Sequence, residues 1–333
     1  MTAATVLAST ENLSRDEWLA YRNLGIGGSD ASVVLGVNKY KSPIELWMEK
    51  TGQQQPEEAG EAAYWGTLME PLIRDEFALR SGIEVIPVNQ ILQSVDYPFM
   101  LANLDGACRC PVHGKCVFEA KTASAFKADE WNGSAVPFEY ILQLQHYLYV
   151  TGYNGAYIAA LIGGNAFQWK FVPRDEEMIS TLIRIERDFW MHVQDDVPPG
   201  LDGSDACGRF LGKLYPYSIA RSKITLPGSA AELIRRHNDA DGHVELYTEQ
   251  KQEAANMLKQ MLGEHEVGIA GGSTVRWQTV KQKRFNAALL ESEQPEIHAK
   301  YITESSYRRF TIKEGKSAES GNAQEQSLLR KAG

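Results

Sequence analysis

The chain has 333 residues, 43% of them hydrophobic and 23% charged, with a formal net charge of −9. This length allows one large domain or two modest ones, and we find no apolar run of the roughly 20 residues that cross a bilayer and no secretory signal in residues 1–12, so we expect a cytoplasmic protein. The acidic balance argues against a protein that coats nucleic acid by bulk charge, although a local basic track is compatible with it.

The first 82 residues are predicted to be mainly helical. A glycine-rich loop, GIGGSD at 25–30, interrupts the helical pattern and lets backbone N–H groups approach a ligand. Capping residues and glycine stops place the helices at 15–22, 30–35, 44–50 and 61–80.

Residues 83–121 change to short β-rich runs, and helices and a hairpin follow. The runs of apolar and β-branched residues predict strands at 83–88, 91–95, 99–102 and 116–120, with turns at 105–106 and 113–114. Further on, the pattern predicts a helix at 138–150, a hairpin of strands 156–162 and 167–172, and a helix at 175–193. The fold class predicted is α/β or α+β, with a central mixed sheet flanked by helices.

The chain beyond residue 195 is organised differently. An Asp-, Pro- and Gly-rich linker at 195–205 is followed by a long helix at 230–262, a hairpin within 267–285 and a strand at 306–312. We therefore expect four parts: an N-terminal segment 1–14, a main domain 15–205, a C-terminal helix and hairpin region 206–312, and a disordered tail 313–333.

Two carboxylates and a lysine form the most informative pattern. Asp105 precedes Glu119 by 14 residues across predicted strands, so a hairpin would bring their oxygens together as ligands for a hard cation such as Mg²⁺. Strand alternation puts Glu119 and Lys121 on one face. Such a group suits phosphodiester hydrolysis, with Glu70 of the preceding helix as a third carboxylate. The alternative is an ordinary hairpin turn beside a solvated strand face.

Five ordered segments carry a resemblance to a known family. They are residues 22–43 around the GIGGSD loop, 66–71 (GTLMEP), 104–106, 119–121 (EAK) and 140–146. In this order they resemble the YqaJ viral-recombinase family, whose best-known relative is λ exonuclease, within the PD-(D/E)XK nucleases. The resemblance covers roughly residues 15–195.

The resemblance implies a restriction-endonuclease-like core and an exonuclease that digests one strand of duplex DNA from its 5′ end. Asp105, Glu119 and Lys121 match the catalytic trio, Glu70 the helix carboxylate and Gln143 the glutamine beside the site. The implied cofactor is Mg²⁺, held by Asp105, Glu119 and Glu70, with Mn²⁺ as a substitute. For Gln143 the alternative is an amide on the helix surface.

A second set of residues is expected to bind the DNA end. Arg22 and Ser29 match positions that hold the 5′-terminal phosphate in this family, and Trp18, one helical turn before Arg22, could stack on a terminal base. Asn103 stands where relatives carry a serine before the Asp-Gly, which leaves its phosphate contact in doubt. The alternatives are a core role for Trp18 and, for His146 near Gln143, a hydrogen-bonded interior histidine.

The segment between Asp105 and Glu119 contains four potential zinc ligands: Cys108, Cys110, His113 and Cys116. A structural Zn²⁺ could fix this hairpin, although the Cys-x-Cys spacing is tighter than usual, and a turn that happens to contain cysteines is favoured. The C-terminal region offers a basic and aromatic track as a DNA surface or, more simply, a solvated face. Its residues are Trp277, Lys281, Lys283, Arg284, Phe285, Tyr307, Arg308 and Arg309.

The leading hypothesis is a Mg²⁺-dependent 5′-to-3′ exonuclease that acts on double-stranded DNA ends and makes 3′ single-stranded tails for phage-type recombination. The resemblance suggests a single-strand annealing protein as partner, a ring-shaped trimer around DNA and a phage or prophage origin in a bacterial cytoplasm. The competing hypotheses are an endonuclease or single-strand nuclease on the same core, and a non-catalytic protein that binds DNA ends or a partner.

Overall fold

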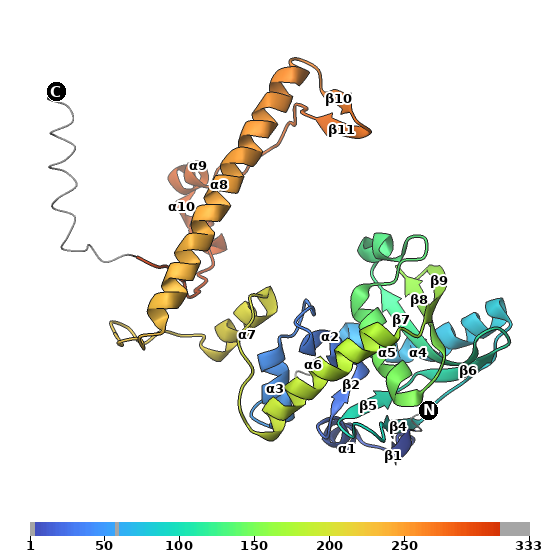
Figure 1. Cartoon of the computed structure of the whole chain (residues 1–333). Helices are drawn as coiled ribbons and strands as arrows, with labels where there is room; N and C mark the ends of the chain where they lie inside the picture. Colours follow the sequence, from blue (N-terminus) through green and yellow to red (C-terminus); the bar gives the residue numbers. More distant parts are fainter. Residues whose placement is uncertain (1–3, 57–59, 314–333) are drawn as a thin grey trace, which may run out of the picture. The chain divides into compact units, whose positions relative to one another are not determined.

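The core of the chain is a five-stranded mixed sheet, seen here in a computed structural model that describes residues 4–56 and 60–313 (Figure 1). Its strands lie in the order β3-β6-β7-β8-β9. They are β3 (Val85–Ile86), β6 (Gly106–Cys110), β7 (Gly114–Ala123), β8 (Gly155–Ile162) and β9 (Ala166–Pro173). The parallel pair β7 and β8 forms its centre, and β8 is buried almost throughout because helices cover both faces. The predicted mixed sheet is confirmed.

Two helices sandwich this sheet. On one face α4 (Glu61–Ser81) packs Ile73 and Phe77 against Phe118 and Tyr157. On the other face α5 (Phe138–Thr151) contributes Leu144 and Leu148 to a second apolar cluster, and α6 (Glu176–Gln194) packs on α5. Alternation along the strands sends successive side chains to these two clusters, as the apolar pattern predicts.

The position of β6 corrects one expectation. The predicted turn at 105–106 is instead the start of this strand, whose residues Gly106 and Cys108 pair with Phe118 and Cys116 of β7. The strand before it, β5 (Met100–Asn103), belongs to another sheet. Asp105 therefore lies where the chain passes from one sheet to the other.

That second sheet has four strands in the order β1-β4-β5-β2. The outer strands are β1 (Thr5–Ser9) and the two-residue β2 (Ile26–Gly27), with β4 (Gln90–Gln93) beside β5. Because β1 pairs with β4, the expected N-terminal segment 1–14 contributes a strand to the first unit and is not a separate part. The parallel pairing of β2 with β5 sets Gly27 beside Leu101.

Three short helices surround the glycine-rich loop. They are α1 (Arg15–Arg22), α2 (Gly28–Val34) and α3 (Pro43–Lys50). Ser14 and Ser42 cap α1 and α3 by accepting bonds from Glu17 N and Glu45 N. Helix α2 begins at Gly28, two residues earlier than predicted, so the end of the glycine-rich loop forms the first turn of this helix.

A buried ion pair joins the helices to the second sheet. Nδ1 of His146 lies 2.9 Å from Oε1 of Glu186, and its Nε2 lies 2.9 Å from the carbonyl oxygen of Leu101. Burial acts to lower the pKa of His146, but Glu186 outweighs it and the pKa is raised. The interpretation of His146 as a hydrogen-bonded interior histidine is confirmed.

The chain divides into two compact units between Tyr215 and Pro216. This division lies ten residues beyond the boundary expected at 205, because an additional helix, α7 (Asp205–Leu214), packs Cys207 and Phe210 into the cluster around α3. The short 3-10 helix η1 (Ala125–Trp131) also belongs to the first unit.

The second unit contains the predicted long helix and hairpin. They are α8 (Ala230–Leu262) and the strands β10 (Val267–Ala270) and β11 (Ser273–Arg276). The expected strand at 306–312 is wrong, since these residues have no regular structure, whereas α9 (Ala287–Glu293) and α10 (Pro295–Tyr301) were not predicted. The predicted tail lies, from residue 314 on, outside the described residues. In the described part of the chain, no helix is long and apolar enough to span a membrane.

Candidate active site

The pairing of β6 with β7 brings the two predicted carboxylates together. Because Gly106 lies opposite Phe118, the preceding Asp105 lies beside Glu119 at the end of the ladder. Oδ2 of Asp105 accepts a hydrogen bond from the backbone N–H of Ala120 at 2.8 Å, which fixes the carboxyl group against β7. Glu119 is buried, with 2% of its surface exposed. Both carboxylates thus meet at one point on the edge of the core.

The lysine and the glutamine meet at the same carboxylate. Nζ of Lys121 lies 2.6 Å from Oε1 of Glu119, on the shared strand face that alternation predicts. Nε2 of Gln143, which is buried on α5 and not on the helix surface, donates to the same oxygen at 2.6 Å. The other oxygen of Glu119, Oε2, is buried and has no hydrogen-bond partner. A buried carboxylate oxygen without a partner is costly unless a ligand satisfies it.

The electrostatics of this corner favour a bound cation. Burial, followed by the charge of Asp105, raises the pKa of Glu119, and burial raises the pKa of Asp105. Burial and the charge of Asp105 also raise the pKa of Glu70, to about 7. Burial acts to lower the pKa of Lys121, but Glu119 and Asp105 outweigh it and the pKa is raised. The three raised pKa values come first from burial, with repulsion between carboxylates added for Glu70 and Glu119, and a bound cation would favour the ionised form of all three groups.

These residues fit a magnesium ion held by two carboxylates. Among the described residues no group of three or more His, Cys, Asp or Glu side chains is arranged to hold a metal ion, so Glu70 does not close a direct three-carboxylate set. Mg²⁺ commonly binds through one or two carboxylates and keeps several waters or substrate oxygens. The unpartnered Oε2 of Glu119 and the neighbouring Asp105 are such a pair.

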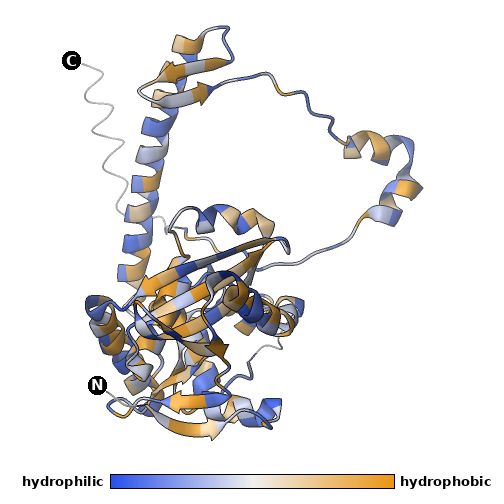
Figure 2. Ribbon diagram, turned by 90° about the vertical axis from the view of Figure 1, so that its right-hand side faces the viewer, coloured by the Kyte–Doolittle hydropathy of each residue, from blue (hydrophilic) through white to orange (hydrophobic). Residues whose placement is uncertain are grey.

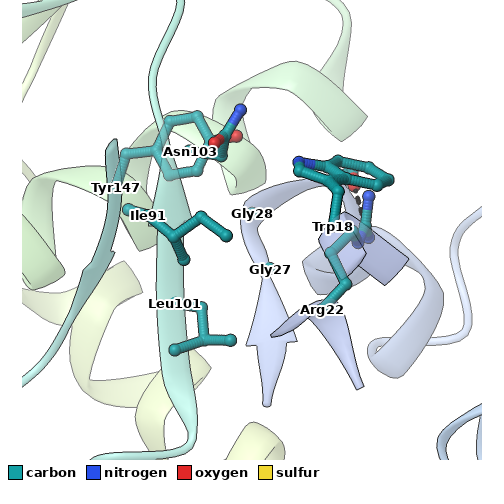
Figure 3. Close-up of a pocket in the computed structure, with 10 residues that line it drawn as sticks. Trp18, Arg22, Gly27, Gly28, Ile91, Leu101, Asn103 and Tyr147 are labelled. Atoms are coloured by element: carbon teal, nitrogen blue, oxygen red, sulfur yellow. Dashed lines mark hydrogen bonds between the residues drawn. The ribbon is translucent and has the colours of Figure 1, made fainter. Parts of the chain in front are cut away.

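A second pocket contains the residues predicted to bind the DNA end. Trp18, Arg22, Ser29 and Asn103 all line it, together with Tyr147. Figure 3 shows Trp18 and Arg22 on one side of this pocket and Asn103 and Tyr147 on the other. The guanidinium of Arg22 lies 5.1 Å from the centre of the Trp18 ring, and Nη2 of Arg22 donates to Oγ of Ser29 at 3.1 Å. Helix α1 has no buried residues, so Trp18 is not a core anchor.

Two charged residues that the sequence did not identify hold this pocket in place. Asp30 accepts from Nη2 of Arg22 at 2.6 Å and lies 3.0 Å from Nζ of Lys50. Burial acts to raise the pKa of Asp30, but Arg22 and Lys50 outweigh it and the pKa is strongly lowered. Asp30 is therefore ionised and serves as the counter-ion of both Arg22 and Lys50, although burial lowers the pKa of Lys50. Asp30 is the last residue of the GIGGSD segment, so its place in that segment could have identified it. Lys50 could not be identified in this way, because it lies 28 residues from Arg22.

One helix connects the two pockets. On α5, Gln143 donates to the hydroxyl oxygen of Tyr147 at 3.2 Å, one helical turn further on. The Tyr147 ring lies so close to Gly28 that a Cβ at position 28 would be 2.4 Å from its Cε1. Only a glycine fits there, because real Cβ atoms do not approach so closely. The i, i+4 spacing of Gln143 and Tyr147 was the signal that the sequence offered.

A third hollow lies over the lysine. Ser29, Lys121 and Gln143 line it, so it borders both the corner of Asp105, Glu119 and Lys121 and the pocket of Trp18, Arg22 and Ser29. These two sites are called below the catalytic corner and the phosphate pocket, after their expected roles. Half of the other side chains that line the hollow are basic or aromatic, namely Lys39, Tyr40, Lys127 and Tyr140. Nζ of Lys121 lies 5.1 Å from the centre of the Tyr140 ring. Sequence reasoning missed these four residues because they lie in irregular loops or at the first turn of a helix.

The cysteine hairpin is packed as core. Cys108, Cys110 and Cys116 are buried in the apolar cluster under α4, as alternation along β6 and β7 requires. His113 stacks its ring on Phe171, with centroids 3.7 Å apart. The possible zinc set of these four side chains, which the sequence analysis did not favour, is not arranged to hold a metal ion in the described residues. The basic and aromatic residues proposed as a track, from Trp277 to Arg309, all belong to the second unit.

The sequence of this chain is similar to one protein-family model and to several known proteins. Residues 17–154 match the model of the YqaJ-like viral recombinase domain. The chain is 40% identical over 315 residues to the protein YqaJ of Bacillus subtilis (strain 168), which covers 93% of this chain and 98% of that protein. It is 23% identical over 238 residues to protein R354 of Acanthamoeba polyphaga mimivirus, covering 67% of this chain and 43% of that protein.

Among solved structures, the chain is similar to an alkaline exonuclease from Laribacter hongkongensis. That structure has 18% identity and a TM-score of 0.46, and the match covers 60% of this chain and 99% of the other. A phage-related exonuclease from Haemophilus somnus 129PT has 13% identity and a TM-score of 0.42, covering 54% and 97%.

Proposed function

Because the chain belongs to the YqaJ family, we propose that it is a metal-dependent deoxyribonuclease, and specifically a 5′-to-3′ exonuclease of double-stranded DNA. The observation that carries this proposal is the corner of Asp105, Glu119 and Lys121, with its unpartnered carboxylate oxygen beside a cationic pocket. A site that must hold a divalent cation and a phosphate together needs both features. A protein that merely binds DNA ends needs only the pocket.

The proposed cofactor is Mg²⁺, with Mn²⁺ as a substitute, held by Asp105 and Glu119 while Glu70 adds negative charge nearby. A bound Mg²⁺ supplies Lewis-acid polarisation of the phosphoryl group and makes water a stronger nucleophile. Gln143 keeps Glu119 oriented through its hydrogen bond to Oε1. The ammonium of Lys121 faces the third hollow, where it orients the attacking water or balances the charge that develops on the phosphate.

The phosphate pocket supports the proposed preference for the 5′ end of the DNA strand. The guanidinium of Arg22 and the hydroxyl of Ser29 suit a terminal phosphate, and the backbone N–H groups at the start of α2 add donors of the same kind. Trp18 offers a flat face to a terminal base, with Asn103 on the opposite wall. This arrangement favours an enzyme that starts at a 5′-phosphorylated end over an endonuclease or a single-strand nuclease.

The proposed cellular location, partner and assembly rest on the similarity of this chain to the YqaJ family. We propose that the enzyme works in the cytoplasm of a bacterium that carries a phage or prophage, on double-stranded DNA ends. The 3′ single-stranded tails that it leaves are the substrate of a single-strand annealing protein, which is the proposed partner. A ring-shaped trimer around the duplex would keep the enzyme on the DNA during digestion.

The test is digestion of linear duplex DNA with 5′-phosphate or 5′-hydroxyl ends, with Mg²⁺ or with EDTA. We expect Mg²⁺-dependent loss of the 5′-ended strand, faster from phosphorylated ends. Arg22→Ala should reduce the preference for phosphorylated ends by roughly tenfold or more while residual cleavage remains, because it removes a charge-assisted hydrogen bond.

Each alternative has its own outcome in this assay. Equal cleavage of linear and circular substrates would indicate an endonuclease, and digestion confined to single strands a single-strand nuclease. If no divalent metal supports cleavage and the protein still binds DNA ends, the result would indicate a non-catalytic protein that binds DNA ends.

A further inference from the structure

The third hollow, which lies over Lys121, contains side chains that the proposed mechanism does not use. Its volume is about 250 Å³, which corresponds to roughly eight water molecules. A space of this size suits a single nucleobase rather than a base pair. Figure 2 shows hydrophilic residues interspersed with hydrophobic ones over the helices of the first unit, and the hollow has the same mixed lining.

The lining of the hollow carries more positive than negative charge. Among the described side chains it has three lysines and one carboxylate: Lys39, Lys121, Lys127 and Glu139. Glu119 pairs with Lys121 at 2.6 Å in the catalytic corner. Glu130 pairs with Lys39 at 3.7 Å, and both of these side chains are exposed, so this pair contributes little. A hollow of this sign attracts an anion such as a phosphate.

Lys127 and Tyr40 form a pair within this lining. Nζ of Lys127 donates to Oη of Tyr40 at 3.2 Å and lies 5.5 Å from the centre of the ring. This hydrogen bond raises the pKa of Lys127, so the side chain is a cation at neutral pH. Because the hydroxyl that accepts the bond is neutral, the charge of Lys127 stays available to a phosphate.

The ring of Tyr40 is exposed, but the backbone that carries it is fixed. The residue is 72% exposed. Oδ1 of Asn38 accepts from the backbone N–H of Tyr40 at 2.8 Å, and Nδ2 of Asn38 donates to Oγ of Ser32 on α2 at 2.9 Å. An aromatic ring that is open to solvent and lies beside a cation is the kind of surface on which the bases of single-stranded nucleic acid stack.

Helix α5 shows on which side of the catalytic corner the hollow lies. Tyr147 lines the phosphate pocket, Gln143 contacts the catalytic carboxylate and Tyr140 lines the hollow. These three positions follow one another along the helix axis, at a rise of about 1.5 Å per residue. A strand that starts in the phosphate pocket and passes the corner therefore continues toward the hollow.

We propose that this hollow binds the first nucleotide that stays on the digested strand after each cut, with its base stacked on Tyr40 and its phosphate held by Lys127. This inference rests on the proposed function, because it takes the phosphate pocket as the place of the 5′ end. The nucleotide is unpaired in the hollow. Stacking on Tyr40 replaces part of the stacking that the base loses when it leaves the duplex, so the hollow lowers the cost of separating the strands.

The stack is tested with 2-aminopurine, a base whose fluorescence falls when it stacks on an aromatic ring. The probe is a 5′-phosphorylated single strand with this base at each of the first few positions in turn, added to the full-length protein in EDTA so that no bond is cut. We expect one position beyond the 5′-terminal base to be quenched. Tyr40→Ala should abolish this quenching and weaken binding roughly fivefold or more, whereas Tyr40→Phe keeps the ring and should retain both.

The phosphate contact is tested with Lys127→Met. Loss of one contact to a single strand should reduce the slope of log affinity against log salt concentration by about 0.7. Lys115→Met is the matched control, because Nζ of Lys115 also lies over a tyrosine ring, that of Tyr153 at 5.8 Å, but lines a different pocket. Its salt slope should equal that of the wild type.

Three results would overturn the inference: no quenched position, quenching that survives in Tyr40→Ala, or quenching confined to the 5′-terminal base. A salt slope that Lys127→Met leaves unchanged would remove the phosphate contact. These measurements do not need cleavage. A protein that shows the expected quenching but cuts no DNA would refute the proposed nuclease and not the stack on Tyr40, whereas a protein that digests 5′ ends without this quenching would refute the hollow alone.

Discussion

Gln143 and Tyr147, one turn apart on the same face of α5, join the catalytic corner to the phosphate pocket, and the two sites treat buried charge in opposite ways. In the pocket, Asp30 is shared by Arg22 and Lys50, and its pKa is lowered. In the corner, the carboxyl groups outnumber the cations that act on them, and their pKa values are raised. Under the proposed function the corner is completed by a bound cation, whereas the charged groups of the pocket neutralise one another.

Under the proposed function, one cleft holds two kinds of phosphate contact. The Arg22 guanidinium, already oriented by Asp30, would bind an anion directly. The carboxyl groups of the corner would bind a metal ion first and the phosphate through it. Four substitutions or conditions test this difference between the two sites.

The largest effect is expected from Asp30→Asn. This change leaves Arg22 and the almost fully buried Lys50 without their counter-ion, and breaking a buried ion pair costs about 3–5 kcal/mol. We expect that loss in the free energy of unfolding, measured by urea denaturation. Asp75→Asn is the matched control, because Asp75 is 73% exposed in its side chain and pairs only with Arg74 at 3.5 Å. Equal stability of the two variants would show that the pocket is not prepaired.

Lys121→Met should remove the cation from the corner and keep the length of the side chain. We expect cleavage to slow by roughly 10²- to 10³-fold, as when a group that stabilises transition-state charge is removed. Lys115→Met, six residues earlier on the same strand and exposed, is the control. Single-turnover digestion checks the rate, and a loss of less than about threefold would assign Lys121 a structural role.

The stability of the metal-free protein should fall as the pH rises. The folded pKa of Glu70 is raised to about 7, and that of Glu119 is also raised. A raised folded pKa contributes stability that is present below the unfolded value, near 4.5, and lost as the pH rises through the folded value. In EDTA, the melting temperature should therefore drop between about pH 5 and pH 8, and Mg²⁺ should restore it at pH 8.

Glu119→Gln provides the control for this pH dependence. The neutral amide removes one of the two groups that titrate and leaves Glu70, so the decline with pH should become shallower and Mg²⁺ should stabilise the variant less. A decline identical to that of the wild type would contradict the idea that the corner lacks a cation.

The smallest effect is expected from Tyr147→Phe, which removes only the hydroxyl that accepts from Gln143. A single hydrogen bond contributes about 1 kcal/mol, so we expect cleavage to slow by a few fold with the apparent Mg²⁺ affinity almost unchanged. Measurement of the rate against Mg²⁺ concentration separates the two quantities. A tenfold loss of Mg²⁺ affinity would mean that the phosphate pocket and the corner are not independent.

The sequence predicts the chemistry of the corner better than the path of the chain around it. Strand alternation is enough to place Glu119 and Lys121 on one face, and this holds because β7 is a regular strand of ten residues. The two-residue strand β2 and the strand β6, whose cysteines and arginine mask its apolar face, carry too little periodicity to be predicted, whereas β3 falls within the strand predicted at 83–88. The separation into two sheets was missed for the same reason.

Contacts between distant segments account for the rest. Lys50 reaches Asp30 behind the phosphate pocket because α3 packs on α2, and no local pattern encodes that packing. The same holds for Glu186, whose partner His146 is 40 residues away. In the second unit, the strand predicted at 306–312 fails because β propensity by itself does not form a strand without a neighbour to pair with.

The glycine at position 28 has a consequence for the length of the product. It lets Tyr147 of α5 touch the start of α2, while Gln143, one turn away on the same helix, touches the catalytic carboxylate. An α-helix turn has a nearly invariant rise of about 5.4 Å. Under the proposed function, the span between the phosphate that is gripped and the bond that is cut is therefore set by a rigid ruler, and each catalytic step would remove the same number of nucleotides whatever the base sequence.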